Sequence, residues 1–317
     1  MAKRIELAKF GKRSDLHSSL TVIAHLAMVF SPVFVAAFLG PSLWWIVLWI
    51  SFGFLMNGLL NLMHECAHYH VFTGREGSDF LGRWILGPLA IADFDAYRWR
   101  HWKHHTNFGI DGDPKDAYLV DIRGSRLIAF FLRCLTLREA LRKFRHASEQ
   151  GEAKEKTTSN PFFWLARAAV LQALLFGVLL LAAGPAAGRA WPRALLVVIL
   201  AYGFIYVYGL ASLTVFAATL RAVAEHQLEA GQLPSPSRGA LRNFKCGPIS
   251  RLIFGAYGFA EHGTHHVEPS LPYYHLPAAT DELAEDDPEF VPNHRYLDEL
   301  AVLAKIYPLQ PSAEESR

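Results

Sequence analysis

Most of the histidine in this chain lies in three short boxes whose spacing is typical of metal ligands. Of 15 histidines among 317 residues, eight lie in HECAH (64–68), HWKHH (101–105) and HGTHH (262–266). Residues three and four apart share one face of a helix, so HxxxH is expected to direct two imidazoles at one point and HxxHH three. Neutral imidazole binds zinc, iron, copper and nickel. The boxes therefore predict a metal site rather than a set of solvated surface histidines.

A ninth histidine, His226 in RAVAEH (221–226), follows an apolar run and is placed to complete the ligand set from a separate helix. Nine imidazoles are too many for one ion and suit two ions with four or five ligands each. Glu65, Glu225 and Glu261 each sit beside one of these histidines. Because adjacent residues do not share a helix face, we expect each glutamate to orient a ligand on another helix or to pair with an arginine.

Four long apolar runs must position these residues. They cover residues 19–40, 42–63, 162–184 and 194–220, and each matches the ~20 residues with which a helix crosses the hydrocarbon core. Short turns join the first two and the last two runs, which predicts two hairpins. Four buried helices of a soluble protein are disfavoured, because such long runs with few charges are hard to cover. We expect an all-α, multi-pass integral membrane protein in which residues 1–317 form a single domain.

Lysine and arginine predict which side of the membrane carries the boxes. The segment 64–160 is rich in both, whereas the turn at 40–42 has neither. The first residues of the chain are also basic, through Lys3, Arg4, Lys9, Lys12 and Arg13. By the positive-inside rule, we expect both termini in the cytoplasm of a bacterial inner membrane. A helical cap built from residues 64–160 and 221–300 then carries all the histidine boxes on that side.

Charge and cysteine content exclude several other classes. The formal net charge is +2, which gives no general footprint for nucleic acid. The three cysteines, Cys66, Cys134 and Cys246, are far apart and form no CxxC pair, which suits a reducing compartment. The sequence contains no cysteine set for an iron–sulfur cluster and no glycine-rich dinucleotide fingerprint. A redox reaction in this chain would therefore need electrons from a separate protein.

The three boxes, in this order and with the last one leading into VEPSLPYYHLP (267–277), resemble the membrane fatty acid desaturases and their hydroxylase relatives. GDP (112–114), RAVAEH and LRNF (241–244) are similar to bacterial members, and the resemblance covers about residues 40 to 280. It implies two iron ions and O2-dependent attack on an unactivated C–H bond. The ligands that carry over from the family are His64, His68, His101, His104, His105, His226, His262, His265 and His266.

One position departs from the family pattern. Animal acyl-CoA desaturases have an asparagine one helical turn before the ligand that corresponds to His226, and it helps to hold a metal-bound water. This chain has Ala222 there. Glu225 and Glu261 are candidates to hold such a water instead.

The substrate is expected to be a long apolar chain that enters between the cap and the membrane. Arg98, Lys103 and Arg242 are candidates to bind an anionic head group, such as a phosphopantetheine, a coenzyme A or a phospholipid phosphate. An equal alternative is that these cations face the phosphates of the surrounding lipid.

The leading hypothesis is a di-iron desaturase that introduces a double bond into a fatty acyl chain. The first alternative is a hydroxylase or ketolase on the same scaffold, acting on a fatty acyl, carotenoid or other lipid. A metal transporter is disfavoured because its ligands would lie near the bilayer midplane, and a hydrolytic dizinc site would need bridging carboxylates. The expected electron donor is a ferredoxin, a rubredoxin or a b-type cytochrome with its reductase. A basic cytoplasmic surface suits an acidic donor.

Overall fold

The computed structural model describes residues 14–108, 113–114, 122, 124–149, 161–226, 241–292, 294–298 and 301. Within these residues every regular element is a helix, and the one strand-like pairing is an isolated bridge between Phe244 and His294. The predicted all-α class is confirmed. The basic residues before position 14, on which the expected orientation partly rests, lie outside the described residues.

Four helices are long and apolar enough to cross a membrane, which confirms the four predicted spans. They are α1 (Asp15–Leu39), α2 (Trp44–Ala67), α9 (Pro161–Ala183) and a continuous helix over Trp191–Glu225. The last of these consists of α10 (Trp191–Ala201), two π-helical segments (Tyr202–Tyr208 and Leu210–Thr214) and α11 (Val215–Glu225). Many of their outward side chains are large, apolar and exposed, as lipid contact requires. The chain is a multi-pass membrane protein.

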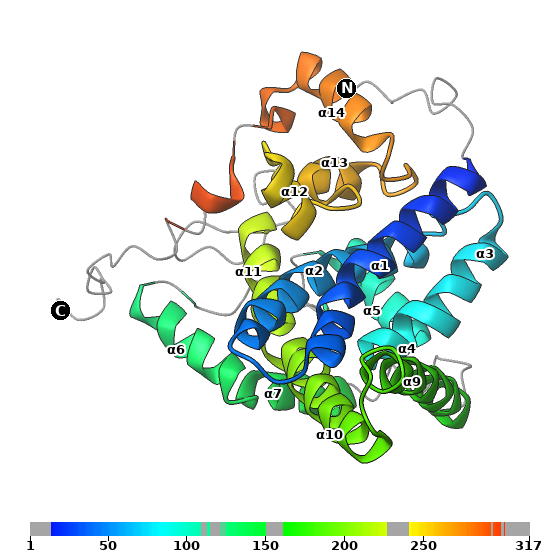
Figure 1. Ribbon diagram of the computed structural model, residues 1–317. Coiled ribbons are helices and arrows are strands. Elements are labelled where there is room, and N and C mark those ends of the chain that lie inside the picture. The colour runs from blue at the N-terminus through cyan, green and yellow to red at the C-terminus, as the bar shows by residue number, and fades with distance from the viewer. Residues whose placement is uncertain are drawn as a thin grey trace.

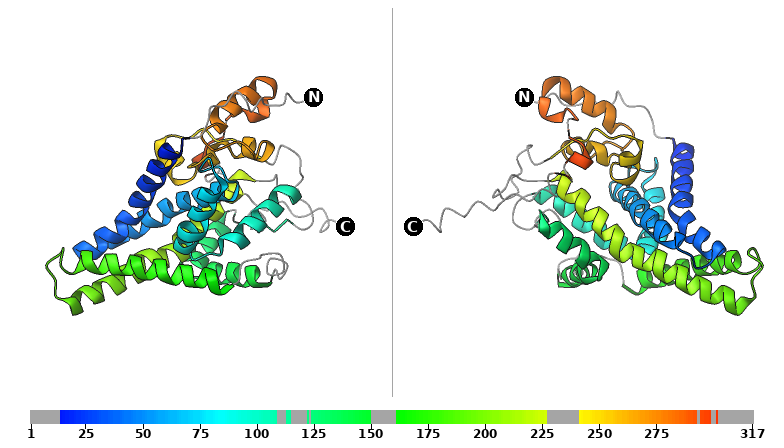
Figure 2. Two further views of the ribbon diagram at one scale, coloured as in Figure 1. Left: turned by 90° about the vertical axis from the view of Figure 1, so that its right-hand side faces the viewer. Right: turned by 60° about the vertical axis from the view of Figure 1, so that its left-hand side comes forward.

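The spanning helices form two hairpins that pack together. Helix α1 packs on α2, α9 packs on α10, and α1 contacts both members of the second hairpin. Figure 2 shows both pairs, blue and green, running toward one end of the molecule. At that end Arg189, which lies in the connection between α9 and α10, donates to the carbonyl oxygens of Ala37 (3.3 Å) and Ala183 (3.1 Å). These carbonyls belong to the last turns of α1 and α9, where the helix itself offers no donor.

Two of the spanning helices extend further than the apolar runs predict. Helix α2 continues to Ala67 instead of residue 63, so that His64 lies on the helix itself. The helix that begins at Trp191 reaches Glu225 and contains 35 residues. At 1.5 Å per residue it is about 52 Å long, against a hydrocarbon core of about 30 Å. Its last turns therefore project beyond the hydrocarbon and carry His226 as the C-terminal cap.

The remaining helices gather at the end of the molecule that carries the boxes (Figures 1 and 2). They are α3 (Arg75–Phe80), a π-helical segment (Leu81–Leu86), α4 (Gly87–Ala90), α5 (Phe94–Asn107), α6 (Ser125–Leu135), α7 (Arg138–Glu149), α12 (Pro248–Ile253), a 3-10 turn (Phe259–Glu261), α13 (His262–Val267), α14 (Leu276–Asp286) and a second 3-10 turn (Pro288–Phe290).

Two asparagines of α2 fasten the C-terminal part of this cap to the membrane-spanning helices. Asn57 donates to the carbonyl of Ile253 at 2.7 Å, and Asn61 donates to the carbonyls of Phe254 (3.0 Å) and Ala256 (3.1 Å). Both side chains are fully buried. A buried amide without partners costs free energy, so these bonds hold the segment before the third box at one position on α2.

The close approach of α2 to the fourth spanning helix predicts a stability effect. A Cβ added at Gly53 would collide with the side chain of Leu213. Gly53→Ala should therefore lower the free energy of unfolding by about 1–3 kcal/mol, the usual range for overpacking. The measurement is the thermal unfolding midpoint of the detergent-purified protein.

Gly177→Ala on α9 is the matched control, because apart from the adjacent residues and the backbone of its own helix no atom lies within 4 Å of the added Cβ. Its midpoint should stay unchanged or rise slightly, since alanine is the better helix former. Equal midpoints for the two variants would show that α2 does not pack so closely on the fourth spanning helix.

Candidate metal centre

The first box lies where α2 ends. His64 is in the last turn, and the chain leaves the helix at His68, whose backbone N–H still bonds to the carbonyl of His64 at 3.3 Å. His64 and His68 thus project from the same side of one helix end, as the i, i+4 spacing predicts. Both are buried.

Helix α5 carries the second box and is bound to the end of α2. Asp93 caps its N-terminus by accepting from the backbone N–H groups of Asp95 (2.9 Å) and Ala96 (3.3 Å). Arg98 donates to the carbonyl of Cys66 at 3.2 Å, and Trp102 donates to that of Ala67 at 3.1 Å. The last carbonyls of α2 lack partners within the helix. By accepting these two bonds from α5, they position the second box.

The third box lies on α13, a helix of only six residues that needs support from its neighbours. Asn243 provides it: its side-chain amide donates to Thr264 Oγ1 (3.0 Å) and to the carbonyl of Phe290 (2.9 Å), and its Oδ1 accepts from the backbone N–H of Thr264 at 3.1 Å. The hydroxyls of Thr264 and Thr280 lie 2.7 Å apart. The segment LRNF thus fixes the box from outside the helix.

The structure brings five histidines together in a first cluster. Their ligand atoms all lie within 4.8 Å of one another. The Nε2 atoms of His68 and His101 are 2.6 Å apart, those of His101 and His105 3.0 Å, and those of His105 and His265 3.3 Å. His64 is the fifth member, with its ring centroid 4.2 Å from that of His101. Helices α2, α5 and α13 all contribute.

The other four predicted histidines form a second cluster. The Nε2 atoms of His226, His262 and His266 form a triangle with sides of 3.2, 3.1 and 3.4 Å. His104 joins His226 and His266 within 4.8 Å. The two clusters adjoin, because the ring of His105 from the first stacks on that of His266 from the second at a centroid distance of 4.4 Å.

The expectation that HxxHH directs three imidazoles at one point is wrong. In each such box the i, i+4 pair points to one cluster and the third histidine to the other. His101 and His105 enter the first cluster while His104 enters the second; His262 and His266 enter the second while His265 enters the first. Adjacent residues on a helix point about 100° apart, so the final HH pair faces two centres. Each HxxHH box therefore links the two clusters.

The triangle of nitrogens in the second cluster is suited to a cation. A ring nitrogen of neutral imidazole presents either one N–H or one lone pair, so at least two of three mutually contacting Nε2 atoms present the same group to each other and form no hydrogen bond. A bound cation removes this conflict, because all three atoms can then direct lone pairs at it. A point equidistant from the three atoms lies about 2 Å from each, the length of a metal–imidazole bond. Burial, reinforced by the neighbouring imidazoles, lowers the pKa of His266 well below its ordinary value. Its neutral, metal-binding form is therefore favoured.

Two carboxylates hold ligand rings from the outside. Glu65 Oε1 lies 3.0 Å from Nδ1 of His64, and Asp113 Oδ1 lies 2.9 Å from Nδ1 of His104. Each fixes its ring and leaves Nε2 directed at the cluster, as outer carboxylates do in metal sites. Glu65 thus contacts its own neighbour in sequence rather than a ring on another helix. Its second oxygen accepts from the backbone N–H of Tyr273 at 3.2 Å.

The other two glutamates behave differently. Glu261 forms an ion pair with Arg251 at 2.8 Å. Burial raises the pKa of Glu261, and the guanidinium of Arg251 opposes that rise. Glu225 is buried at the end of α11, where its Oε2 lies 3.8 Å from Nε2 of His262.

The three arginine and lysine residues expected to face a head group differ in their surroundings. Arg98 is buried; its guanidinium lies 2.5 Å from Asp79 and donates to Tyr69 and to the end of α2. It is therefore part of the scaffold. Lys103 and Arg242 are half-buried. The ammonium of Lys103 lies 5.1 Å from the centroid of the Trp99 ring, and Arg242 donates to the carbonyl of Ala224 at 3.5 Å.

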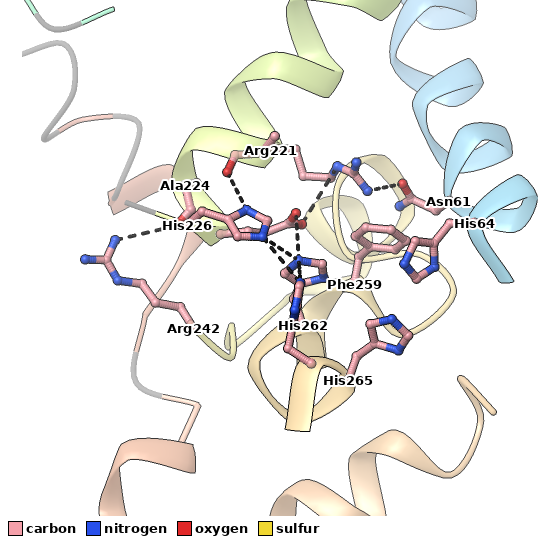
Figure 3. A network of polar contacts seen from close by, with 12 residues as sticks. Asn61, His64, Arg221, Ala224, His226, Arg242, Phe259, His262 and His265 are labelled. Carbon is pink, nitrogen blue, oxygen red and sulfur yellow. Dashed lines mark hydrogen bonds and ion pairs between the residues drawn. The ribbon is translucent and has the colours of Figure 1, made fainter. Parts of the chain in front are cut away.

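Sequence reasoning missed the contacts between the clusters. Figure 3 shows Arg221 over the ring of Phe259, with Asn61 and His64 on one side and His226 and His262 on the other. The guanidinium carbon lies 3.9 Å from the ring centroid, and Arg221 also donates to Oδ1 of Asn61. Phe259 in turn contacts one ring of each cluster, at 4.6 Å from His64 and 5.2 Å from His262. Only the tertiary fold brings these residues together.

Two imidazole clusters, to which two of the four apolar helices contribute histidines at their ends, define a multi-pass membrane protein with a metal-binding site. A family model for fatty acid desaturases matches residues 10–297. The chain belongs to the fatty acid desaturase family, which confirms the resemblance of its histidine boxes.

Similarity to characterised relatives is low and local. The chain is 29% identical over 65 residues to an oleoyl-12-hydroxylase of Ricinus communis, which is 20% of this chain and 16% of the relative. It is 33% identical over 65 residues to a Delta(12) fatty acid desaturase of Mortierella isabellina, with the same coverage. To an acyl-lipid (9+3)-(E)-desaturase of Dimorphotheca sinuata it is 26% identical over 94 residues, 30% of this chain and 22% of the relative. The matched segments thus span less than a quarter of each relative's length.

The bond between Asp113 and His104 predicts an effect on metal affinity. Asp113→Asn keeps the shape of the side chain and removes the charge that holds Nδ1 of His104. The affinity of the second cluster for a divalent metal should fall about 10- to 100-fold, the usual effect of losing an outer carboxylate. The measurement is the rate and extent of metal loss from the purified protein to a chelator.

Glu285→Gln is the control, since Glu285 is an exposed carboxylate on α14. It should lose metal at the wild-type rate. Wild-type retention by Asp113→Asn would mean that Asp113 does not support a ligand.

Proposed function

We propose that this protein is an O2-dependent di-iron oxidoreductase that introduces a double bond into a fatty acyl chain. The observation that carries the proposal is the division of nine imidazoles into two adjoining buried clusters at the ends of membrane-spanning helices. Five histidines of the first cluster and four of the second are the proposed ligands of the two ions. Family membership favours iron over the other metals that imidazole binds.

Iron, when bound, supplies the O2-dependent oxidising power that an unactivated C–H bond requires and that acid–base side chains lack. The chain's own residues provide ligation, orientation and exclusion of water. The backbone carbonyl of Ala222 accepts from Nδ1 of His226 at 2.9 Å and so orients that ring, as the two outer carboxylates orient theirs. The ligand rings are almost all buried, which keeps bulk water from the reacting centre.

The proposed substrate is a long alkyl chain that reaches the clusters from the membrane. Both the end of α2 and the end of the fourth spanning helix carry ligands, so the metals would lie next to the hydrocarbon region. Lys103 and Arg242 are the proposed contacts for an anionic head group or acyl thioester. Arg98 is left out because its guanidinium is engaged within the protein.

Hydroxylation is the second candidate. It is favoured by the similarity to the oleoyl-12-hydroxylase of Ricinus communis, which is as strong as the similarity to the desaturases. The same ligand set would serve either outcome, and placement of the alkyl chain relative to the metals would select between them.

The proposal includes a cytoplasmic active site in a bacterial inner membrane, within a single domain. Electrons would come from a separate ferredoxin, rubredoxin or b-type cytochrome with its reductase. The half-buried cations near the second box and near residue 242 would suit an acidic donor.

His265→Ala tests the function through its products. His265 is the one member of the third box in the first cluster, so its loss should lower activity at least about 100-fold, more than loss of an outer partner does. The measurement is mass spectrometry of total lipids from cells that express the protein together with a donor. The wild-type strain should accumulate a lipid lighter by two hydrogens than its precursor.

His17→Ala is the matched control, because His17 is exposed at the start of α1; it should give the wild-type lipid profile. A product heavier by one oxygen would replace desaturation by hydroxylation. Undiminished product from His265→Ala would contradict the role of the first cluster.

A further inference from the structure

Among the acidic residues near the two clusters, Glu225 faces a different ring nitrogen. Glu65 and Asp113 each approach Nδ1, the atom on the outer side of the ligand ring. Oε2 of Glu225 instead lies 3.8 Å from Nε2 of His262. This Nε2 is the atom that lies 3.2 and 3.1 Å from the Nε2 atoms of His226 and His266. The carboxylate of Glu225 is therefore on the inner side, where the ion would be held.

We propose that Glu225 is itself a ligand, and supplies a carboxylate oxygen to the metal at the second cluster. This site would then consist of four imidazoles and one oxygen, whereas the first would consist of five imidazoles. The inference rests on the proposed metal-dependent function and makes the two metal positions chemically unequal.

The local structure explains how two adjacent residues reach one ion. Glu225 is the last residue of α11, and His226 has left the helix, with φ −119° and ψ 22°. The 100° angle that separates neighbours inside a helix does not apply across this boundary. Glu225, His226 and His262 consequently place one ligand atom each within 4.8 Å of one another.

The other oxygen of Glu225 is held away from the cluster. The hydroxyl of Tyr296 lies 3.0 Å from Oε1 and 2.9 Å from the carbonyl oxygen of Phe259, so its one proton is shared between these two acceptors. Oε1 also lies 3.8 Å from Nε of Arg221. Burial raises the pKa of Tyr296 well above its ordinary value, so the hydroxyl keeps its proton and acts as the donor. Glu225 and Tyr296 are each only 1% exposed. Fixing Oε1 in this way directs Oε2 toward the nitrogens.

Charge provides the physical reason for a carboxylate here. Four neutral imidazoles do not offset the charge of a buried divalent ion, and the guanidinium of Arg221 adds a further positive charge nearby. A buried charge without an opposite partner is strongly unfavourable. A directly bound carboxylate offsets the ion, and the same group balances Arg221 through its outer oxygen.

Metal binding to the Glu225→Gln variant tests this proposal without relying on turnover. The purified full-length chain is loaded anaerobically with Co²⁺, whose visible absorption reports its ligand set. The wild-type protein should take up two equivalents. Glu225→Gln keeps the size of the side chain and removes the anionic ligand, so one equivalent should bind at least about 10-fold more weakly. The absorption of that equivalent should also change, while the other stays as in the wild type.

Two further variants separate ligation from a structural role. Glu261→Gln is the matched control, because Glu261 is also buried beside a ligand in sequence but forms an ion pair with Arg251; it should leave both equivalents and both spectra unchanged. Tyr296→Phe frees Oε1 and keeps the carboxylate, so it should retain two equivalents with a shifted spectrum at one. If Glu225 only paired with Arg221 and Tyr296, Glu225→Gln would leave both cobalt spectra unchanged, which would overturn its role as a ligand. Failure of the wild-type protein to bind cobalt would overturn the metal site itself.

Discussion

Nine imidazoles whose nitrogens face one another, most of them buried, are the constraint on which the rest of the structure depends. Such an arrangement is unfavourable without a cation, because three ring nitrogens within hydrogen-bond distance of one another cannot all form hydrogen bonds together. The protein stabilises this arrangement with polar groups of α2 that are free to bond to other segments. Carbonyls at the end of α2 bind α5, and asparagines on α2 bind the segment before α13. The three boxes are thereby positioned from a single helix end.

The membrane explains where this end must lie. Backbone and charged groups inside the hydrocarbon need internal partners, so a polar centre is best built where the spanning helices leave it. Helix α2 and the 35-residue fourth helix both continue past the apolar runs and carry His64 and His226 there. The proposed function would use this position, because an alkyl chain would reach the site from the bilayer and electrons would reach it from a protein in the aqueous phase.

The sequence predicts those features that appear as local patterns. These are the four spans, which are long apolar runs, and the nine histidines, which lie in the three boxes and at the end of the last run. It does not predict how the histidines divide between the two clusters. The HxxHH spacing alone fits one centre, whereas the adjacent histidines His104 and His105 point to different clusters. Asp113 lies nine residues after His104 and Tyr296 lies 71 residues after Glu225, and neither pairing follows from a helical spacing. The sequence makes Arg98 a candidate for binding an anionic head group, and only its burial against Asp79 shows that it belongs to the scaffold.

The central claim is that these imidazoles form two separate metal sites. Elemental analysis of iron-loaded wild-type, His68→Ala and His226→Ala proteins tests it directly, because each substitution removes a member of one cluster. We expect two irons per chain in the wild type and one in each variant, with the retained iron differing between the two variants in its Mössbauer spectrum. A single iron in the wild type, or loss of all iron from both variants, would contradict it.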